Sequence, residues 1–325
     1  MASANPNYSD ILATTIESRS RKIADNVTNN NALLKKLSMR GNIKTVSGGS
    51  KILQELSFAE NTNSGWYSGY DILPVGVTDT LTAAEFDFKQ AAVPVIISGL
   101  EQLQNSGKER MIDLMDARLS VAESTLSNLI ATGLYSDGSA AGGKQIDGLD
   151  AAVPVDPTAA VYGGIDGATY TFWQNAVSNQ TAADGLDATK IQGYWNELWA
   201  SLVRGNDRPD LIPVDSTVWG AFTASLQALQ RFASPDVGQL GFPTLKYMDA
   251  DVVLDGGIGV ACPAGTGFFL NTSYIHYRPH ANRNMVSLSP NRRYATNQDA
   301  EVQILAWAGI LTTSGRKFQG RYDAT

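Results

Sequence analysis

The longest helical pattern in the sequence runs from Ser98 to Gly133, and no other stretch constrains the fold as strongly. Apolar or small residues recur every three or four positions, the spacing of one helix face: Met111, Met115, Leu119, Ala122, Leu126, Leu129 and Ile130. The opposite face is charged, with Arg110, Asp113, Asp116, Arg118 and Glu123. A helix over 107–132 would be about 39 Å long at roughly 1.5 Å per residue. Its apolar face is predicted to lie on a sheet, and its charged face on solvent or a partner.

Two serine–glutamate pairs indicate where this helix begins. Ser106 with Glu109, and Ser98 with Glu101, both have the three-residue spacing of a capping box. Gly133 can adopt the left-handed conformation that ends a helix. We therefore expect a short helical turn at Ser98 and then one long helix that ends at Gly133.

The composition limits the class of protein. The 325 residues can form two or three compact units, and only 18% are charged, which favours a surface that other copies of the chain cover. A net charge of −7 disfavours a chain-wide electrostatic grip on nucleic acid. The single cysteine, Cys262, excludes a disulfide framework and a C-x-x-C zinc site, and favours synthesis in a reducing cytoplasm.

Residues 1–45 are predicted to form an arm, with short helices at about 8–24 and 30–39. The arm lacks a signal peptide, and no window of the chain is long and apolar enough to cross a bilayer. Residues 44–94 then alternate as strands do, with a turn at 60–65 and a second strand from Trp66. Because an isolated hairpin is marginal in water, this one needs a surface to lie on. The pattern leaves open whether that surface is its own domain or a neighbouring subunit.

A glycine-rich connection at 137–167 precedes a second compact unit. Helices are expected over 172–177 and 189–203, and Ser216 is placed to cap another helix that runs to Phe232. Short strands are expected at 211–214, 245–247, 251–254, 267–270, 274–277, 285–288 and 300–312. This alternation favours a small mixed sheet covered by helices.

The motifs that could carry chemistry are incomplete. Residues 138–144 match G-x-x-x-x-G-K, but Gln145 stands where a phosphate-binding loop needs serine or threonine, and the segment follows a helix rather than a strand. His276 and His280 flank Pro279 in a strand-like stretch, which removes the helical geometry of a zinc pair. Cys262 lacks the basic neighbours of a reactive thiol. We therefore predict no enzyme activity, no metal and no cofactor.

Basic residues gather at two places near the C-terminus. These are Arg283, Arg292 and Arg293, and then Arg316, Lys317 and Arg321. Because the chain is acidic overall, we interpret them as partners of carboxylates, including those of neighbouring subunits, rather than as a DNA-binding surface. The candidates for subunit contacts are Trp66, Tyr67, Tyr70, Arg110, Arg118, Arg292 and Arg293.

Several segments, taken in order, resemble the major capsid proteins of tailed bacteriophages with the Hong Kong 97-type shell fold. They are the helix segment 106–119, then 144–149, 162–166, 171–173, 208–212, 230–232, 241–242, 251–255 and 269–274. The resemblance implies an α+β fold with an N-terminal arm (1–45), an extended β-hairpin loop (46–95), a peripheral domain with a long spine helix (96–185 and 285–325) and an axial α/β domain (186–284).

The resemblance also implies a function. A major capsid protein of this type assembles with itself, as hexamers and pentamers, into an icosahedral head around double-stranded DNA. It implies portal, scaffolding or decoration proteins as further partners, no membrane, and a place in the virion after synthesis in the bacterial cytoplasm. Two alternatives stay open: an encapsulin-type nanocompartment shell, and a phosphate-handling enzyme that uses the loop from Gly138 to Lys144.

Overall fold

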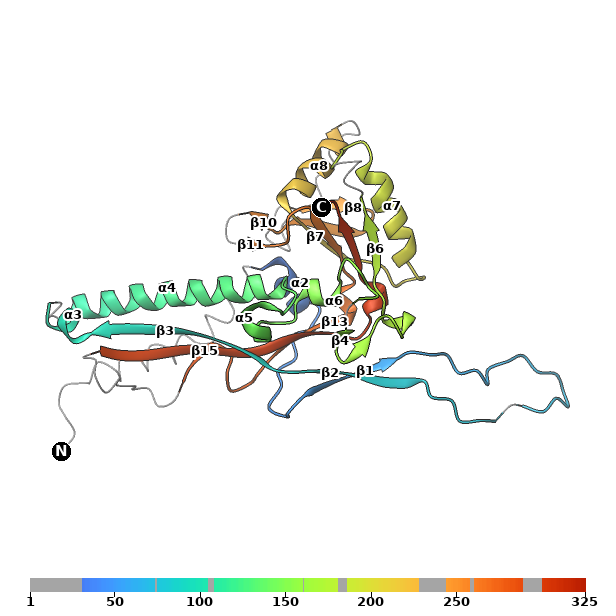
Figure 1. The fold of residues 1–325 in the computed structure, drawn as a ribbon, viewed down its shortest axis with the longest axis horizontal. Coiled ribbons are helices and arrows are strands. Elements are labelled where there is room, and N and C mark those ends of the chain that lie inside the picture. Colours follow the sequence, from blue (N-terminus) through green and yellow to red (C-terminus); the bar gives the residue numbers. More distant parts are fainter. Residues whose placement is uncertain are drawn as a thin grey trace.

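The computed structural model describes residues 31–73, 75–104, 108–159, 161–180, 186–227, 244–257, 260–288 and 300–325. They form an elongated molecule of helices and sheets (Figure 1). A long helix lies along one end, a hairpin extends beyond the other end, and a helix-covered sheet stands to one side. No helix within these ranges is long and apolar enough to span a membrane.

The predicted long helix is present as α4 (Lys108–Leu134), which follows the short helix α3 (Gly99–Gln104). It lies along the strand β3 (Lys89–Ser98), as Figure 1 shows. Its described buried side chains confirm most of the predicted stripe: Leu119, Ala122, Leu126 and Ile130. Leu129 is 48% exposed and does not belong to it. The side chains of Met111 and Met115 lie outside the described residues.

One predicted cap is confirmed and one predicted helix end is wrong. The Ser98 N–H donates to Oε2 of Glu101 at 3.1 Å, and the Glu101 N–H donates to Oγ of Ser98 at 3.3 Å. Ser106 lies outside the described residues. Gly133 does not end α4, because the helix continues to Leu134 without a left-handed residue at 133. A Cβ there would lie 3.0 Å from Cδ1 of Ile146, so glycine permits a close approach instead.

α4 covers a four-stranded sheet built around β15 (Ala300–Thr313). β15 pairs antiparallel with β3, with β13 (Ile275–Pro279) and with β14 (Val286–Ser287). Leu305, Trp307, Ile310 and Leu311 of β15 are buried. The predicted packing of the long helix on a sheet that contains 300–312 is therefore confirmed.

The second sheet has six strands in the order β6-β16-β12-β7-β9-β8. Their bounds are β6 Ala176–Asn179, β16 Gly320–Asp323, β12 Thr266–Phe269, β7 Leu211–Val214, β9 Ala250–Leu254 and β8 Thr244–Tyr247. Two helices, α7 (Ile191–Leu202) and α8 (Ser216–Gln227), pack on this sheet. Trp195 of α7 is fully buried and stacks on Phe222 of α8 with ring centroids 4.5 Å apart.

Two local predictions for this unit are wrong. Residues 172–177 are not a helix, because a 3₁₀ turn (Thr171–Trp173) leads into β6, which pairs in parallel with β16. Ser216 is not the cap of α8, because Oδ2 of Asp215 accepts the N–H of Thr217 at 3.2 Å. The expected end of that helix at Phe232 lies outside the described residues.

The sheets cross the predicted domain boundaries. β6 and β16 come from outside 186–284 but join the six-stranded sheet, whereas β13 comes from inside that range and joins the sheet under α4. The division into peripheral and axial domains stays a prediction. Among the first residues, α2 (Ala32–Met39) confirms the helix expected at 30–39, while the helix at 8–24 lies outside the described residues.

The hairpin consists of β1 (Ile52–Ser57) and β2 (Leu81–Phe86), paired antiparallel from Ile52 with Phe86 to Ser57 with Leu81. Residues 58–80, called the hairpin loop below, join them, so the predicted second strand from Trp66 is wrong. The shorter elements are α5 Ala140–Gly143, α6 Leu149–Ala152, β4 Val161–Tyr162, β5 Ile165–Asp166, β10 Gly256–Gly257, β11 Val260–Ala261, η2 Thr272–Tyr274 and η3 Arg316–Phe318.

Candidate assembly surface

The hairpin loop exposes a large set of apolar side chains. Five of them are fully or almost fully exposed: Trp66, Tyr70, Ile72, Val75 and Val77. Tyr67 and Leu73 are also more than half exposed. An exposed apolar cluster of this size is typical of a site of contact with another surface.

Polar contacts hold the hairpin loop in its extended course. Phe58 N–H donates to the carbonyl oxygen of Thr80 at 3.1 Å, and Nδ2 of Asn63 donates to that of Gly76 at 2.7 Å. At the tip of the loop, midway between β1 and β2, the Ser68 N–H donates to Oδ2 of Asp71 at 2.9 Å. The loop extends away from the rest of the molecule (Figure 1). These contacts shape it without burying its aromatic rings, so the rings stay available to a partner.

Arg118 has a structural task within its own chain. Its Nη2 lies 2.5 Å from Oε1 of Glu101, and its Nη1 donates to the carbonyl oxygen of Ile96. Arg118 thereby links the long helix α4 to the capping box of Ser98 and Glu101 at the start of α3. The remaining arginine candidates are not placed: the side chain of Arg110 lies outside the described residues, as do Arg292 and Arg293.

The last basic cluster is largely internal. Arg316 is fully buried, with its Nε 2.7 Å from the carbonyl oxygen of Ala152, and burial lowers its pKa to about 10. Arg321 is buried too, and its Nη2 lies 2.9 Å from Oδ2 of Asp323. Carboxylate pairing is thus confirmed for Arg321, but within the chain. Only Lys317 of this group is exposed, so the expectation of subunit contacts fails for both arginines.

The glycine-rich loop at 138–144 contacts β3 of its own chain through Lys89. Three residues separate it from the end of α4, and Ala141, Gly142 and Gly143 adopt left-handed backbone conformations. Nζ of Lys89 donates to the carbonyl oxygen of Gly143 at 2.7 Å and lies 3.7 Å from Oδ1 of Asp147. The strand that precedes a phosphate-binding loop is therefore replaced by a helix, as the sequence indicated.

The histidines do not meet other metal ligands in the described part of the chain, where no group of three or more histidine, cysteine or acidic side chains gathers. His276 is buried in β13, and burial, with Lys44 and Arg278 nearby, lowers its pKa to about 4. His280 lies against the ring of Phe88. Both are placed as structural side chains.

A buried hydrogen bond to an aspartate joins the end of α4 to the six-stranded sheet. The hydroxyl of Tyr135, just after α4, donates to Oδ2 of Asp255, which follows β9. Cys262 is buried close by, as expected for a small apolar side chain. Burial raises the pKa of Asp255, which has no ion pair with a described residue, and the Tyr135 hydrogen bond opposes this only in part.

We expect Asp255→Asn to flatten the pH dependence of stability. A carboxyl whose pKa is raised on folding binds more protons in the native state, so its contribution to the free energy of unfolding falls as pH rises above its ordinary pKa. The amide keeps an acceptor for Tyr135 but cannot ionise. The melting temperature of the variant should improve relative to wild type between pH 4 and 8, measured by circular dichroism. Parallel curves for the two proteins would contradict the buried-acid interpretation.

The chain resembles known proteins in its structure but not in its sequence. No protein-family model matches the sequence, and no curated protein matches it. A subunit in the capsid asymmetric unit of cyanophage A-1(L) matches with a TM-score of 0.64 and 16% identity over 88% of this chain and 92% of that chain. This chain has a phage capsid-protein fold.

Two further capsid-fold structures bear on the alternatives. A capsid protein of a native GTA particle matches with a TM-score of 0.59 and 12% identity, over 88% of this chain and 89% of that chain. The SrpI encapsulin of Synechococcus elongatus PCC 7942 matches with a TM-score of 0.53 and 8% identity, over 89% of this chain and 86% of that chain. The capsid fold predicted from the resemblance is confirmed, and it includes encapsulin shells.

Proposed function

We propose that this chain is the major capsid protein of a tailed bacteriophage, which assembles with itself into a closed icosahedral head around double-stranded DNA. One observation carries the proposal: the capsid fold extends over most of the chain and bears a hairpin loop whose apolar side chains are exposed in the single subunit. Since exposed rings of this kind lower the free energy only when covered, a neighbouring subunit is the surface that they need.

The roles of individual parts follow from this proposal. Trp66, Tyr67 and Tyr70 would contact the neighbouring subunit, in hexamers and pentamers of the shell. Arg110, Arg118, Arg292 and Arg293 would pair with carboxylates of neighbours, and Arg118 would in addition hold the start of the spine helix through Glu101. The segments 96–185 with 285–325 would form the peripheral domain, and 186–284 most of the axial domain. Portal, scaffolding and decoration proteins would be the further partners, and the virion the final location.

The contents of purified particles distinguish this function from the encapsulin alternative, which the structural similarity to SrpI supports. Particles from infected or induced bacteria would be treated with nuclease, opened and analysed. Protected double-stranded DNA of uniform length is expected. A cargo enzyme without DNA would favour the nanocompartment. Nucleotide binding that is lost in Lys144→Ala would instead support the phosphate-handling enzyme.

The free subunit is expected to bind DNA weakly. The net charge of −7 opposes the approach of phosphates, and the buried Arg316 and Arg321 cannot neutralise them, so the closed shell would hold the genome by confinement. Fluorescence anisotropy with a labelled duplex would measure the salt dependence. We expect a log–log slope smaller than about 2, since each neutralised phosphate contributes roughly 0.9. A steep slope would contradict confinement as the means of holding DNA.

A further inference from the structure

The six-stranded sheet has an open edge at β6. In the described part of the chain, β6 pairs only with β16. The N–H of Ala176 donates to the carbonyl oxygen of Gln319 at 3.1 Å, and that of Gln180 to the carbonyl oxygen of Asp323 at 2.8 Å. Because the N–H groups of successive strand residues point to alternate sides, those of Val177 and Asn179 point away from β16. Their carbonyl groups point the same way, so this edge offers two donors and two acceptors.

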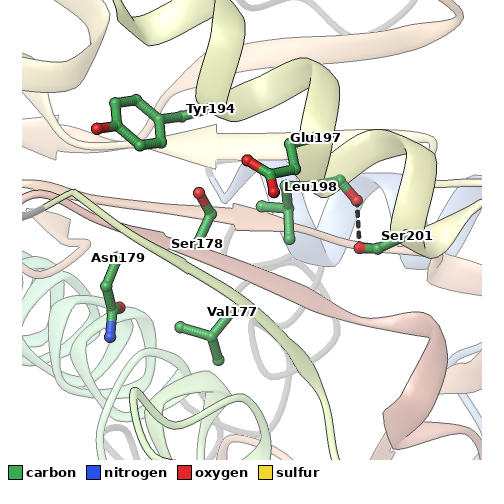
Figure 2. Close-up of a pocket in the computed structure, with 7 residues that line it drawn as sticks. All are labelled: Val177, Ser178, Asn179, Tyr194, Glu197, Leu198 and Ser201. Carbon is green, nitrogen blue, oxygen red and sulfur yellow. Dashed lines mark hydrogen bonds between the residues drawn. The ribbon is translucent and has the colours of Figure 1, made fainter.

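A pocket lies at this same edge, beside α7. Its volume is about 330 Å³, and it is lined by Val177, Ser178, Asn179, Tyr194, Glu197, Leu198 and Ser201. Figure 2 shows Glu197 and Leu198 on the side of α7 that faces Ser178 of β6, with Tyr194 and Ser201 on either side of them. Positions 194 and 201 are about 10 Å apart along a helix, a length that three residues of extended chain span.

The charge of the pocket selects the kind of segment that fits. Glu197 is exposed, it is the single acidic side chain of the lining, which has no lysine or arginine, and it has no ion pair with a described residue. A lysine or arginine opposite Glu197 is therefore favoured, and a segment with acidic residues is disfavoured. The hairpin loop has Glu60, Asp71 and Asp79 and no basic residue, so this contact differs from the one proposed above.

We propose that an extended segment of a second copy of this chain, carrying a lysine or arginine, adds to β6 as an extra strand and places its cation against Glu197. The proposal rests on the proposed function, because a shell of identical chains sets a copy beside every subunit. Strand addition of this type obtains affinity from main-chain hydrogen bonds and specificity from a neighbouring side-chain pocket. The contact is heterologous, since the edge of one copy meets a different segment of the next.

Residue-resolved hydrogen–deuterium exchange tests this on the full chain, as free subunits and as shells. The N–H groups of Val177 and Asn179 should exchange at least about tenfold more slowly in shells, because they gain partners there. The Ser178 N–H, already directed to β16, should change little and serves as the internal control. Equal exchange at Val177 and Asn179 in both states would overturn the proposal. So would protection that requires another bound protein.

Variants distinguish the loss of the proposed contact at the β6 edge from a loss of stability of the sheet itself. Asn179→Pro removes an outward N–H, so it should keep the melting temperature of the subunit but impair assembly. Ser178→Pro removes the N–H directed to β16 and should lower the melting temperature. Glu197→Lys should impair assembly more than Glu197→Gln, because lysine would repel the incoming cation. If the proline variants do not fold, the comparison of these two variants tests the proposed contact. Normal assembly of Glu197→Lys would overturn the proposal while leaving the capsid function intact. Absence of wild-type shells would contradict both.

Discussion

Removing residues 60–70 is expected to give a folded subunit that no longer forms shells. The deletion takes away Trp66, Tyr67 and Tyr70, none of which is buried in the subunit, while the pairing of β1 with β2 remains. Covering three aromatic side chains of roughly 150–250 Å² each would contribute on the order of 10 kcal/mol per subunit before the costs of association. Losing that contribution should abolish assembly, as measured by sedimentation velocity.

A second variant keeps the length of the loop. Serine at all three aromatic positions should fold with an unchanged melting temperature and fail to assemble in the same way. Met248→Ser is the matched control, because Met248 is an exposed apolar side chain at the turn between β8 and β9. It should assemble as wild type does. Normal shells from either hairpin variant would show that the loop is not an essential subunit contact.

The largest loss of subunit stability is expected for Trp195→Ala. Trp195 is fully buried, stacks on Phe222 at 4.5 Å, and meets the rings of Tyr247 and Phe269 edge-on at 5.1 and 5.2 Å. Truncating a buried tryptophan leaves a cavity and costs about 3–5 kcal/mol. Denaturant unfolding followed by circular dichroism measures the free energy of unfolding.

Trp195→Phe is the matched comparison, because it keeps an aromatic ring at the centre of this cluster. We expect it to cost less than half of the loss seen for alanine. A free energy of unfolding that changes by less than about 1 kcal/mol in Trp195→Ala would contradict the role of this residue in holding α7 and α8 on the sheet.

Local patterns in the sequence predicted a large part of the fold. The spacing of Leu119, Leu126 and Ile130 is a property of one helix, and so is the pairing of Ser98 with Glu101, so both could be read without tertiary structure. The features that could not be predicted depend on distant partners. β6 forms because residues near position 320 lie beside it, and Gly133 serves the packing of Ile146 rather than a helix end.

The candidate site divides in the same way. The aromatic residues of the hairpin loop could be found because they follow a cluster of turn residues, and their exposure is consistent with a subunit contact. Burial of Arg316 and Arg321 could not be foreseen, since a basic cluster in a sequence is ordinarily solvated. The open edge at β6 cannot be predicted from local patterns either, because an edge exists only once the order of the strands is known.

Electron microscopy of the purified full chain tests the central claim, that this protein builds a closed shell. Wild-type protein should form closed icosahedral particles of uniform diameter, and the chain lacking residues 60–70 should form none under the same conditions. A wild-type protein that stays monomeric, or that gives only irregular aggregates under all assembly conditions, would contradict the claim.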